Sequence, residues 1–114
     1  MKVENIKAQM RKGVLELCVL GILSKETMYP SDIIRNLKEN DLIVVEGTMY
    51  PLLNRLKKEG YLTYKWVESS SGPPRKYYEI TPKGEELRME LSKSWSTLAQ
   101  TVNFSNSLNT TDNE

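Results

Sequence analysis

The sequence predicts an α+β domain built from three helices, a two-stranded hairpin and a long final helix. Residues 46–60 have the spacing of a short helix with one apolar side and one basic, polar side. Residues 69–84 begin with turn-forming residues, pass through two adjacent cations and continue as a strand. A helical pattern then follows to about residue 104. This order is typical of a winged helix-turn-helix that carries an additional long C-terminal helix.

The bulk composition fits a single small domain. The chain has 114 residues and 39% hydrophobic residues, which allows one core of modest size. Small domains bury a limited share of their surface, and a partner subunit is a common remedy. The net charge is +1, so attraction to an anionic partner would depend on cations gathered on one face.

Several functional classes are disfavoured by what the sequence lacks. With one cysteine, Cys18, and no histidine, it offers no internal disulfide, no His-containing zinc site and no His-based triad. It also has no phosphate-binding glycine loop, so we expect neither an enzyme nor a bound metal or cofactor. The longest apolar run, residues 14–23, is too short to span a bilayer and lacks the flanks of a signal peptide. We therefore expect a cytoplasmic protein without a membrane segment.

The first two helices follow from apolar spacing. Residues 3–24 form one helix, or two in tandem around Gly13, and the part from residue 14 to 23 is apolar nearly all round, so it is central. Pro30 suits the first turn of a second helix, which ends at Asn40-Asp41. The apolar residues 42–45 then predict a minor strand.

The third helix is predicted to begin near Gly47-Thr48. Thr48 would be its N-cap, and Pro51 would then fall in the first turn, where proline is tolerated. Gly60 suits the C-terminal end of this helix.

Alternating residues predict the hairpin. Leu62, Tyr64 and Trp66 share one face of the first strand, which places Trp66 in the hairpin core. Residues 69–74 predict a turn longer than the two-residue minimum, and residues 76–80 form the returning strand.

The final helix opens with Thr81 as a cap and Pro82 at its first position. Its apolar positions form a narrow seam like that of a coiled coil, which predicts a dimerisation helix. The seam residues are Leu87, Leu91, Trp95, Leu98 and Val102. We divide the chain into a winged-helix domain at residues 1–82, this helix at residues 83–104 and a disordered tail at residues 105–114.

Polar side chains on the third helix and two cations after the turn predict a DNA-binding surface. Amide, guanidinium, ammonium and phenol groups on such a helix reach base edges and phosphates in a major groove. A stiff basic loop beside the helix would bridge further phosphates. The candidate DNA-binding residues are Gly47, Thr48, Tyr50, Asn54, Arg55, Lys57, Lys58, Arg75 and Lys76. Each group alone also fits an ordinary solvated surface, and the two together favour DNA.

Three segments carry a family pattern. They are Gly13-Val14-Leu15-Glu16-Leu17, then Gly47-Thr48-Met49-Tyr50-Pro51-Leu52-Leu53 with Arg55-Leu56 and Glu59-Gly60, then Arg75-Lys76-Tyr77-Tyr78 with Ile80-Thr81 and Gly84. In this order they resemble the PadR family of bacterial transcriptional regulators, over about residues 10–104. The resemblance implies a winged-helix repressor that dimerises through its C-terminal helix. Because only one helix follows the winged-helix domain, the chain resembles the compact branch of the family.

One position departs from the family pattern. Members often carry a Gly-Tyr pair before the second helix that helps to hold the DNA backbone, and this chain has Pro30-Ser31 there. Tyr29 or Ser31 would have to replace that contact.

The sequence thus predicts a regulator that binds double-stranded DNA sequence-specifically as a homodimer, acting as a repressor on an inverted-repeat operator. The alternative is a winged-helix module that binds protein rather than DNA, because a winged helix alone does not determine function.

Trp95 has two interpretations. It is either packing in the dimer or a flat wall that stacks on a planar, aromatic effector between subunits, with Ile6 or Met10 closing the site. Some compact PadR-like proteins bind aromatic drugs at the dimer interface with a tryptophan in this region, so the resemblance implies the second as well as the first.

Overall fold

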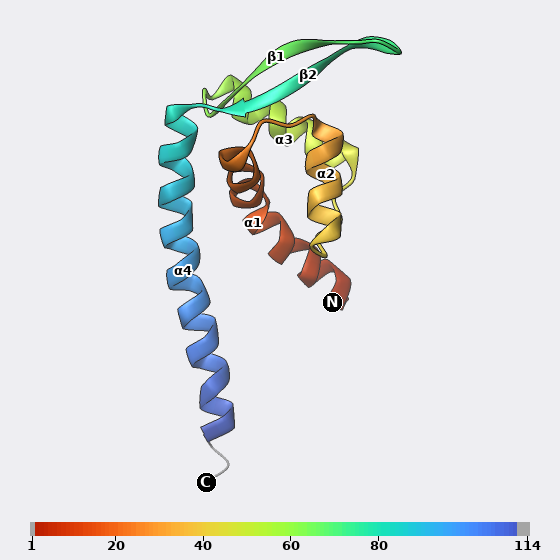
Figure 1. Cartoon of the computed structure of the whole chain (residues 1–114). Coiled ribbons are helices and arrows are strands. Elements are labelled where there is room, and N and C mark those ends of the chain that lie inside the picture. The colour runs from red at the N-terminus through yellow and green to blue at the C-terminus, as the bar shows by residue number, and fades with distance from the viewer. Residues whose placement is uncertain (1, 112–114) are drawn as a thin grey trace.

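The computed structural model describes residues 2–111, with the side chains of residues 108–111 outside that description. Three helices, α1 (Val3–Lys25), α2 (Pro30–Glu39) and α3 (Glu46–Lys58), form the body of the domain. A ribbon of β1 (Leu62–Ser69) and β2 (Gly72–Ile80) crosses one end of it, and α4 (Pro82–Thr111) runs down one side and beyond it (Figure 1). The predicted α+β winged helix-turn-helix with a long C-terminal helix is therefore confirmed.

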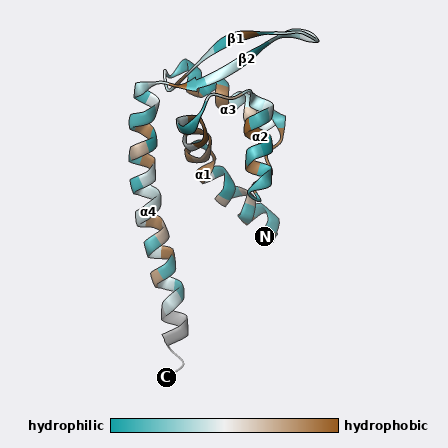
Figure 2. Ribbon diagram, in the orientation of Figure 1, coloured by the Kyte–Doolittle hydropathy of each residue, from teal (hydrophilic) through white to brown (hydrophobic). Residues whose placement is uncertain are grey.

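The core is assembled around the C-terminal half of α1. Figure 2 shows apolar residues on the part of α1 that lies between α2 and α4. The buried apolar side chains are Leu15, Val19, Leu20, Leu23, Ile33, Leu37, Met49, Leu53, Leu56, Leu62 and Tyr78. Because α2, α3, β2 and α4 all contact α1 or its neighbours, this stretch needs apolar residues on almost every side, as its sequence indicated.

Helices α2 and α3 both end with a residue in the left-handed region. Asp41 has φ 69° after α2, and Gly60 has φ 88° after α3. In each case the following N–H reaches back five residues, from Leu42 to the Leu37 carbonyl and from Tyr61 to the Leu56 carbonyl. Gly60 is thus the C-terminal stop that the sequence predicted.

The start of α3 differs from the prediction. The helix begins at Glu46, and the carbonyl of Val45 accepts hydrogen bonds from the N–H groups of Thr48 and Met49. Thr48 therefore lies inside the first turn and is not the N-cap. Pro51 consequently lies in the second turn, where it supplies no N–H to the Gly47 carbonyl.

The predicted strand at residues 42–45 is not present. This segment is a linker without regular secondary structure. The backbone that pairs with the outer edge of β2 comes from Met28 instead, in an isolated bridge to Tyr78. Met28 and Tyr78 exchange two backbone hydrogen bonds, of 3.2 and 2.8 Å. An apolar run indicates burial but does not show which segment pairs with a strand, and in this structure the segment that pairs with β2 is Met28.

The hairpin is also tighter than predicted. Ser69 pairs with Gly72, so only Ser70 and Ser71 form the turn, and both prolines lie within β2. Pro73 and Pro74 are tolerated because they lie opposite a register shift between Val67 and Ser69, where the ladder is interrupted and neither proline has a regular partner.

Trp66 is 61% exposed, so its predicted place in a hairpin core is wrong. The strand alternation is correct, but only the half of the ribbon near Leu62 covers the core, and the side chain of Trp66 lies beyond it.

Helix α4 extends further than the sequence indicated. It continues through residues 105–111, which were expected to be a disordered tail, while residues 112–114 lie outside the described part. Ser105 and Asn106 donate side-chain hydrogen bonds to the Val102 carbonyl, so their polar groups are satisfied within the helix. The radius of gyration is 17.2 Å, against about 13 Å for a compact domain of this length, because α4 protrudes.

The start of α4 is tied to the end of α3. Thr81 caps α4, since its hydroxyl oxygen accepts the Gly84 N–H at 3.0 Å, and the same hydroxyl lies 2.7 Å from the Gly60 carbonyl oxygen, to which it donates. Lys83 donates to the Glu59 carbonyl at 2.8 Å. A Cβ at Gly84 would lie 2.8 Å from Cγ1 of Ile80 and closer still to the Tyr61 carbonyl oxygen, so the two segments approach too closely for any side chain.

Replacing Gly84 by alanine is therefore expected to destabilise the fold. Its methyl group would collide with the Tyr61 backbone, and overpacking of this kind costs about 1–3 kcal/mol or more. Urea unfolding followed by circular dichroism would measure this change. The matched control is Gly21→Ala, since Gly21 lies inside α1 with open space around its Cα, and this substitution should stabilise the helix by up to about 1 kcal/mol. A Gly84→Ala variant as stable as the parent would contradict the close approach.

Candidate nucleic-acid interface

One face of α3 is anchored in the core and the opposite face is open to solvent. Met49, Leu53 and Leu56 are fully buried and hold the helix in place. The candidate residues on this helix are all exposed, namely Gly47, Thr48, Tyr50, Asn54, Arg55, Lys57 and Lys58. A helix held this firmly can present its outer side chains in a constant geometry.

Arg55 differs from the other candidates. Its guanidinium forms an ion pair with Glu16 of α1 and a second, longer one with Glu59, at 3.4 Å. Two carboxylates therefore occupy its donors, and it connects α3 to α1. The sequence placed Arg55 beside the base-contacting residues, but the structure brings it together with Glu16 instead.

Lys57 of α3 and Lys76 of β2 meet at one aromatic ring. The Lys76 ammonium lies 4.6 Å from the centroid of the Tyr64 ring, and the Lys57 ammonium lies 5.5 Å from the same centroid. Lys76 also lies 5.5 Å from the centroid of the Trp66 ring, which stands edge-on to Tyr64. These cation–π contacts join the helix and the ribbon into one basic, aromatic surface.

Arg75 joins the ribbon to the start of α2. Its guanidinium carbon lies 3.9 Å from the centroid of the Tyr29 ring, and its Nη2 donates to the Ser31 hydroxyl at 2.9 Å. These are the two residues that the sequence offered as replacements for the family's backbone-contacting tyrosine. In the structure both contact Arg75, so the three form one group beside α2.

A shallow groove of about 340 Å³ lies between α2, α3 and the ribbon, and the charged and aromatic side chains gather there. It is lined by Pro30, Ser31, Tyr50, Trp66, Arg75, Lys76 and Tyr78. Burial raises the pKa of the Tyr78 hydroxyl, and the nearby Tyr64 and Tyr50 hydroxyls raise it further, so Tyr78 stays neutral. The surface is therefore cationic and aromatic, which suits contact with phosphates.

Trp66 is the residue of this groove that sequence reasoning missed. Strand alternation assigns a residue to a face but does not show whether anything covers that face. The cross-strand partner of Trp66 is Lys76, and this lysine could have indicated an exposed tryptophan, because a ring that contacts a cation usually remains near the surface.

Within the described residues there is no cluster of metal-ligating side chains. None of the helices in that part of the chain is long and apolar enough to cross a membrane.

The fold, with its open third helix and cation-bearing ribbon, is that of a winged-helix DNA-binding protein. The sequence pattern of the transcriptional regulator PadR-like family matches residues 19–90. The chain belongs to this family, whose members are DNA-binding transcriptional regulators and not enzymes.

Solved structures agree with this assignment. A PadR-like transcription factor from Bacteroides fragilis is 61% identical and superposes with a TM-score of 0.74, covering 87% of this chain and 96% of its own. A PadR family regulator from Eggerthella lenta is 31% identical and superposes with a TM-score of 0.82, over 89% of this chain and 88% of the Eggerthella chain. A PadR-like regulator from Bacillus cereus is 45% identical and superposes with a TM-score of 0.73, over 83% of this chain and 93% of the Bacillus chain.

Proposed function

We propose that this regulator is a cytoplasmic repressor that binds an inverted-repeat operator as a homodimer. The observation that carries the proposal is the continuous basic and aromatic surface from α3 to the ribbon, formed where Lys57 and Lys76 share the Tyr64 ring. Among the described residues, neither of these lysines is within ion-pairing distance of a carboxylate. Their charges therefore remain available to phosphates.

The side chains divide into two roles. Tyr50 and Asn54 lie on the exposed face of α3 and carry groups that discriminate between base edges in a major groove. Arg75 and Lys76 lie on the ribbon and would contact the sugar–phosphate backbone, which carries no sequence information. Gly47 and Thr48 at the start of α3 would lie close to a phosphate. Lys57 and Lys58 in its last turn would add further phosphate contacts, whereas Arg55 is held by two carboxylates.

DNA binding should weaken steeply with salt, because each phosphate contact releases counterions. Arg75→Ala and Lys76→Ala should weaken binding to all sequences alike and reduce the salt dependence. Asn54→Ala and Tyr50→Phe should instead alter the preference among sequences, by about 1–3 kcal/mol for a good base contact. Selection of an operator from random DNA, followed by fluorescence anisotropy at several salt concentrations, would measure both effects.

Lys38→Ala is the matched control for that experiment. Lys38 is an exposed cation in the last turn of α2 and does not line the groove. It should leave both affinity and preference unchanged. If all four interface variants bound as tightly as the parent, a winged-helix module that binds protein would be the better interpretation.

The seam of α4 supports a dimer, and its residues fall into two groups. Leu87 and Leu91 are half-buried against the chain's own core. Trp95, Leu98 and Val102, further along the helix, are 49%, 59% and 55% exposed. An apolar stripe of this kind on a protruding helix is typical of a coiled-coil-like contact with a second copy. A two-fold pair of α3 helices would then read two half-sites about one helical turn apart, or a multiple of it.

Placing a charge on the exposed part of the seam should separate the subunits. Leu98→Glu combined with Val102→Glu would bury two unpaired carboxylates from each subunit in the dimer, so we expect a monomer by analytical ultracentrifugation at micromolar concentration. Gln100→Glu is the control, since Gln100 lies on the opposite side of α4, and it should leave the dimer intact. A parent protein that is a folded monomer under these conditions would rule out the proposed dimer.

A groove beside Trp95 supports an effector site at the same interface. Its volume is about 230 Å³, and it is lined by Gly13, Val14, Glu16, Leu17, Leu91, Ser94, Trp95 and Leu98. The predicted partners Ile6 and Met10 do not line it within one chain and are exposed further along α1. They would close the site only from the second subunit. A flat apolar cation would stack on the Trp95 ring there and alter the spacing of the recognition helices.

Titration of planar cationic dyes should therefore quench Trp95 emission. Trp66→Phe removes the other tryptophan, so that the remaining signal comes from Trp95 alone. Trp95→Phe, in which Trp66 is kept, is the matched control and should show no saturable response to the same dyes. If emission from Trp95 stayed constant through every titration, Trp95 would be dimer packing only.

A further inference from the structure

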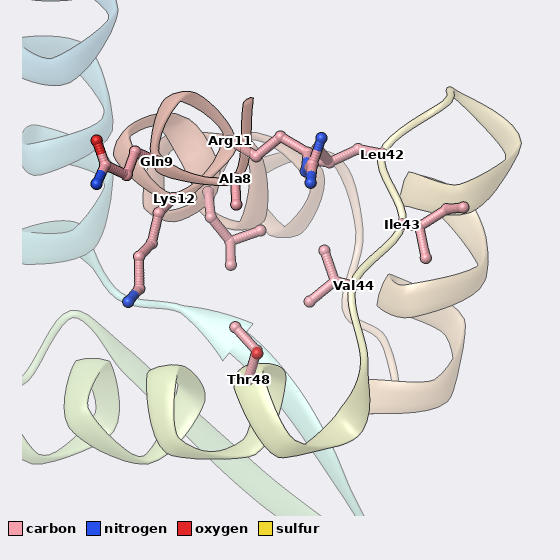
Figure 3. Close-up of a pocket in the computed structure, with 9 residues that line it drawn as sticks. Ala8, Gln9, Arg11, Lys12, Leu42, Ile43, Val44 and Thr48 are labelled. Carbon is pink, nitrogen blue, oxygen red and sulfur yellow. The ribbon is translucent and has the colours of Figure 1, made fainter. Parts of the chain in front are cut away.

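A second groove lies between the N-terminal half of α1 and the linker that enters α3 (Figure 3). It has a volume of about 270 Å³ and shares none of its lining residues with the ribbon groove or with the groove at Trp95. Leu15 of α1 and Leu42 and Val44 of the linker form its apolar side. Figure 3 shows Thr48 directed into it from the first turn of α3, across from Arg11 and Lys12 on α1.

The two cations of this groove have no anionic partner within the described residues. No carboxylate there is within ion-pairing distance of Arg11 or Lys12, and no acidic residue lines the groove. Residues 94–111 of α4 contain no charged residue at all, so the protruding helix of a second copy would bring no carboxylate either. Two cations at the rim of an apolar groove are therefore left to bind an anion from solution.

The groove's shape and composition limit what that anion can be. A DNA phosphate would need no apolar floor, whereas most of this lining is aliphatic and none of it is aromatic. The floor therefore suits an alkyl chain rather than a planar ring. Its volume of about 270 Å³ lies just below the usual range of small-molecule sites, roughly 300–1,000 Å³. Figure 3 shows the Arg11 guanidinium beside Leu42 and the Lys12 ammonium on the opposite side of the groove. We propose that this groove binds a medium-chain aliphatic carboxylate, with Arg11 on the carboxylate, Lys12 adding a second positive charge at the rim, and Leu15, Leu42 and Val44 around the chain.

The position of the groove gives such a ligand a route to the recognition helix. Val44 and Thr48 lie on either side of Val45, whose carbonyl accepts the first two hydrogen bonds of α3. A ligand held between α1 and this segment changes DNA affinity only if it binds the DNA-fitting and non-fitting arrangements unequally. That regulatory effect rests on the proposed function, whereas ligand binding itself does not.

Isothermal titration of the full chain with octanoate, in the absence of DNA, tests the site directly. We expect saturable binding, with amide shifts in NMR spectra at Val44 and Thr48 and unchanged Trp95 emission. Octanol and butyrate, which lack the charge and most of the chain respectively, should bind at least about tenfold more weakly, because charge and alkyl burial both contribute. Arg11→Gln should weaken octanoate by about tenfold, the loss expected for one charge-assisted contact. Lys12→Gln removes only a second charge at the rim and should weaken it less.

Lys7→Gln is the matched control, since Lys7 is an exposed cation of α1 that does not line the groove, and it should bind octanoate as the parent does. Ala8→Trp would fill the groove from its rim and should abolish binding without disturbing the core. The proposal is overturned if octanoate does not bind saturably, if octanol binds equally well, or if the shifts lie around Trp95. Operator affinity with and without octanoate is measured separately, so a failure to bind DNA leaves the result for the groove intact.

Discussion

The close contact between Gly84 and the Tyr61 backbone is the constraint on which the rest of this structure depends. It brings together the end of α3, Tyr61 just before β1, and the start of α4. The Thr81 hydroxyl links these segments, because it donates to the Gly60 carbonyl and accepts from the Gly84 N–H. Because α3, the ribbon and α4 all meet at this point, the contact determines their directions relative to one another. A displacement of α4 against its own body is therefore transmitted to α3 through a junction that has no spare space.

The distribution of cations separates charges that pair with carboxylates of the chain from charges that the proposed DNA interface would use. Arg55 is neutralised by Glu16 and Glu59, and Lys65 lies 3.6 Å from a Glu79 carboxylate oxygen, so both stabilise the chain itself. Lys57, Arg75 and Lys76 contact aromatic rings instead. A ring orients a cation without cancelling its charge, so the ammonium and guanidinium groups keep donors for phosphates. Positioning by aromatic faces thus leaves three cations without an ion pair among the described residues, in a chain whose net charge is only +1.

Two grooves for small molecules would act on one DNA-binding unit by different routes. The groove at Trp95 lies between α1 and α4, where a bound molecule would alter how two subunits meet. The groove at Arg11 and Lys12 touches the linker and the first turn of α3, where a ligand would act within a single subunit. The first suits a flat cation and the second an aliphatic anion, so the two effectors would be chemically distinct and would not compete.

Sequence by itself determined the order of elements, the apolar side of α3, the stop at Gly60, the cap at Thr81 and the class of protein. The class of protein followed from the order of three family segments, and the other features depend on local geometry: helical spacing, a positive φ, or a hydroxyl three residues before a free N–H. The tertiary structure alone decided that Trp66 is exposed, that Arg55 pairs with Glu16, that Met28 rather than the linker lies along β2, and that Arg75 stacks on Tyr29. These contacts join residues between 39 and 50 positions apart in the chain, or depend on whether a neighbouring element covers a face. Local periodicity carries no information about either.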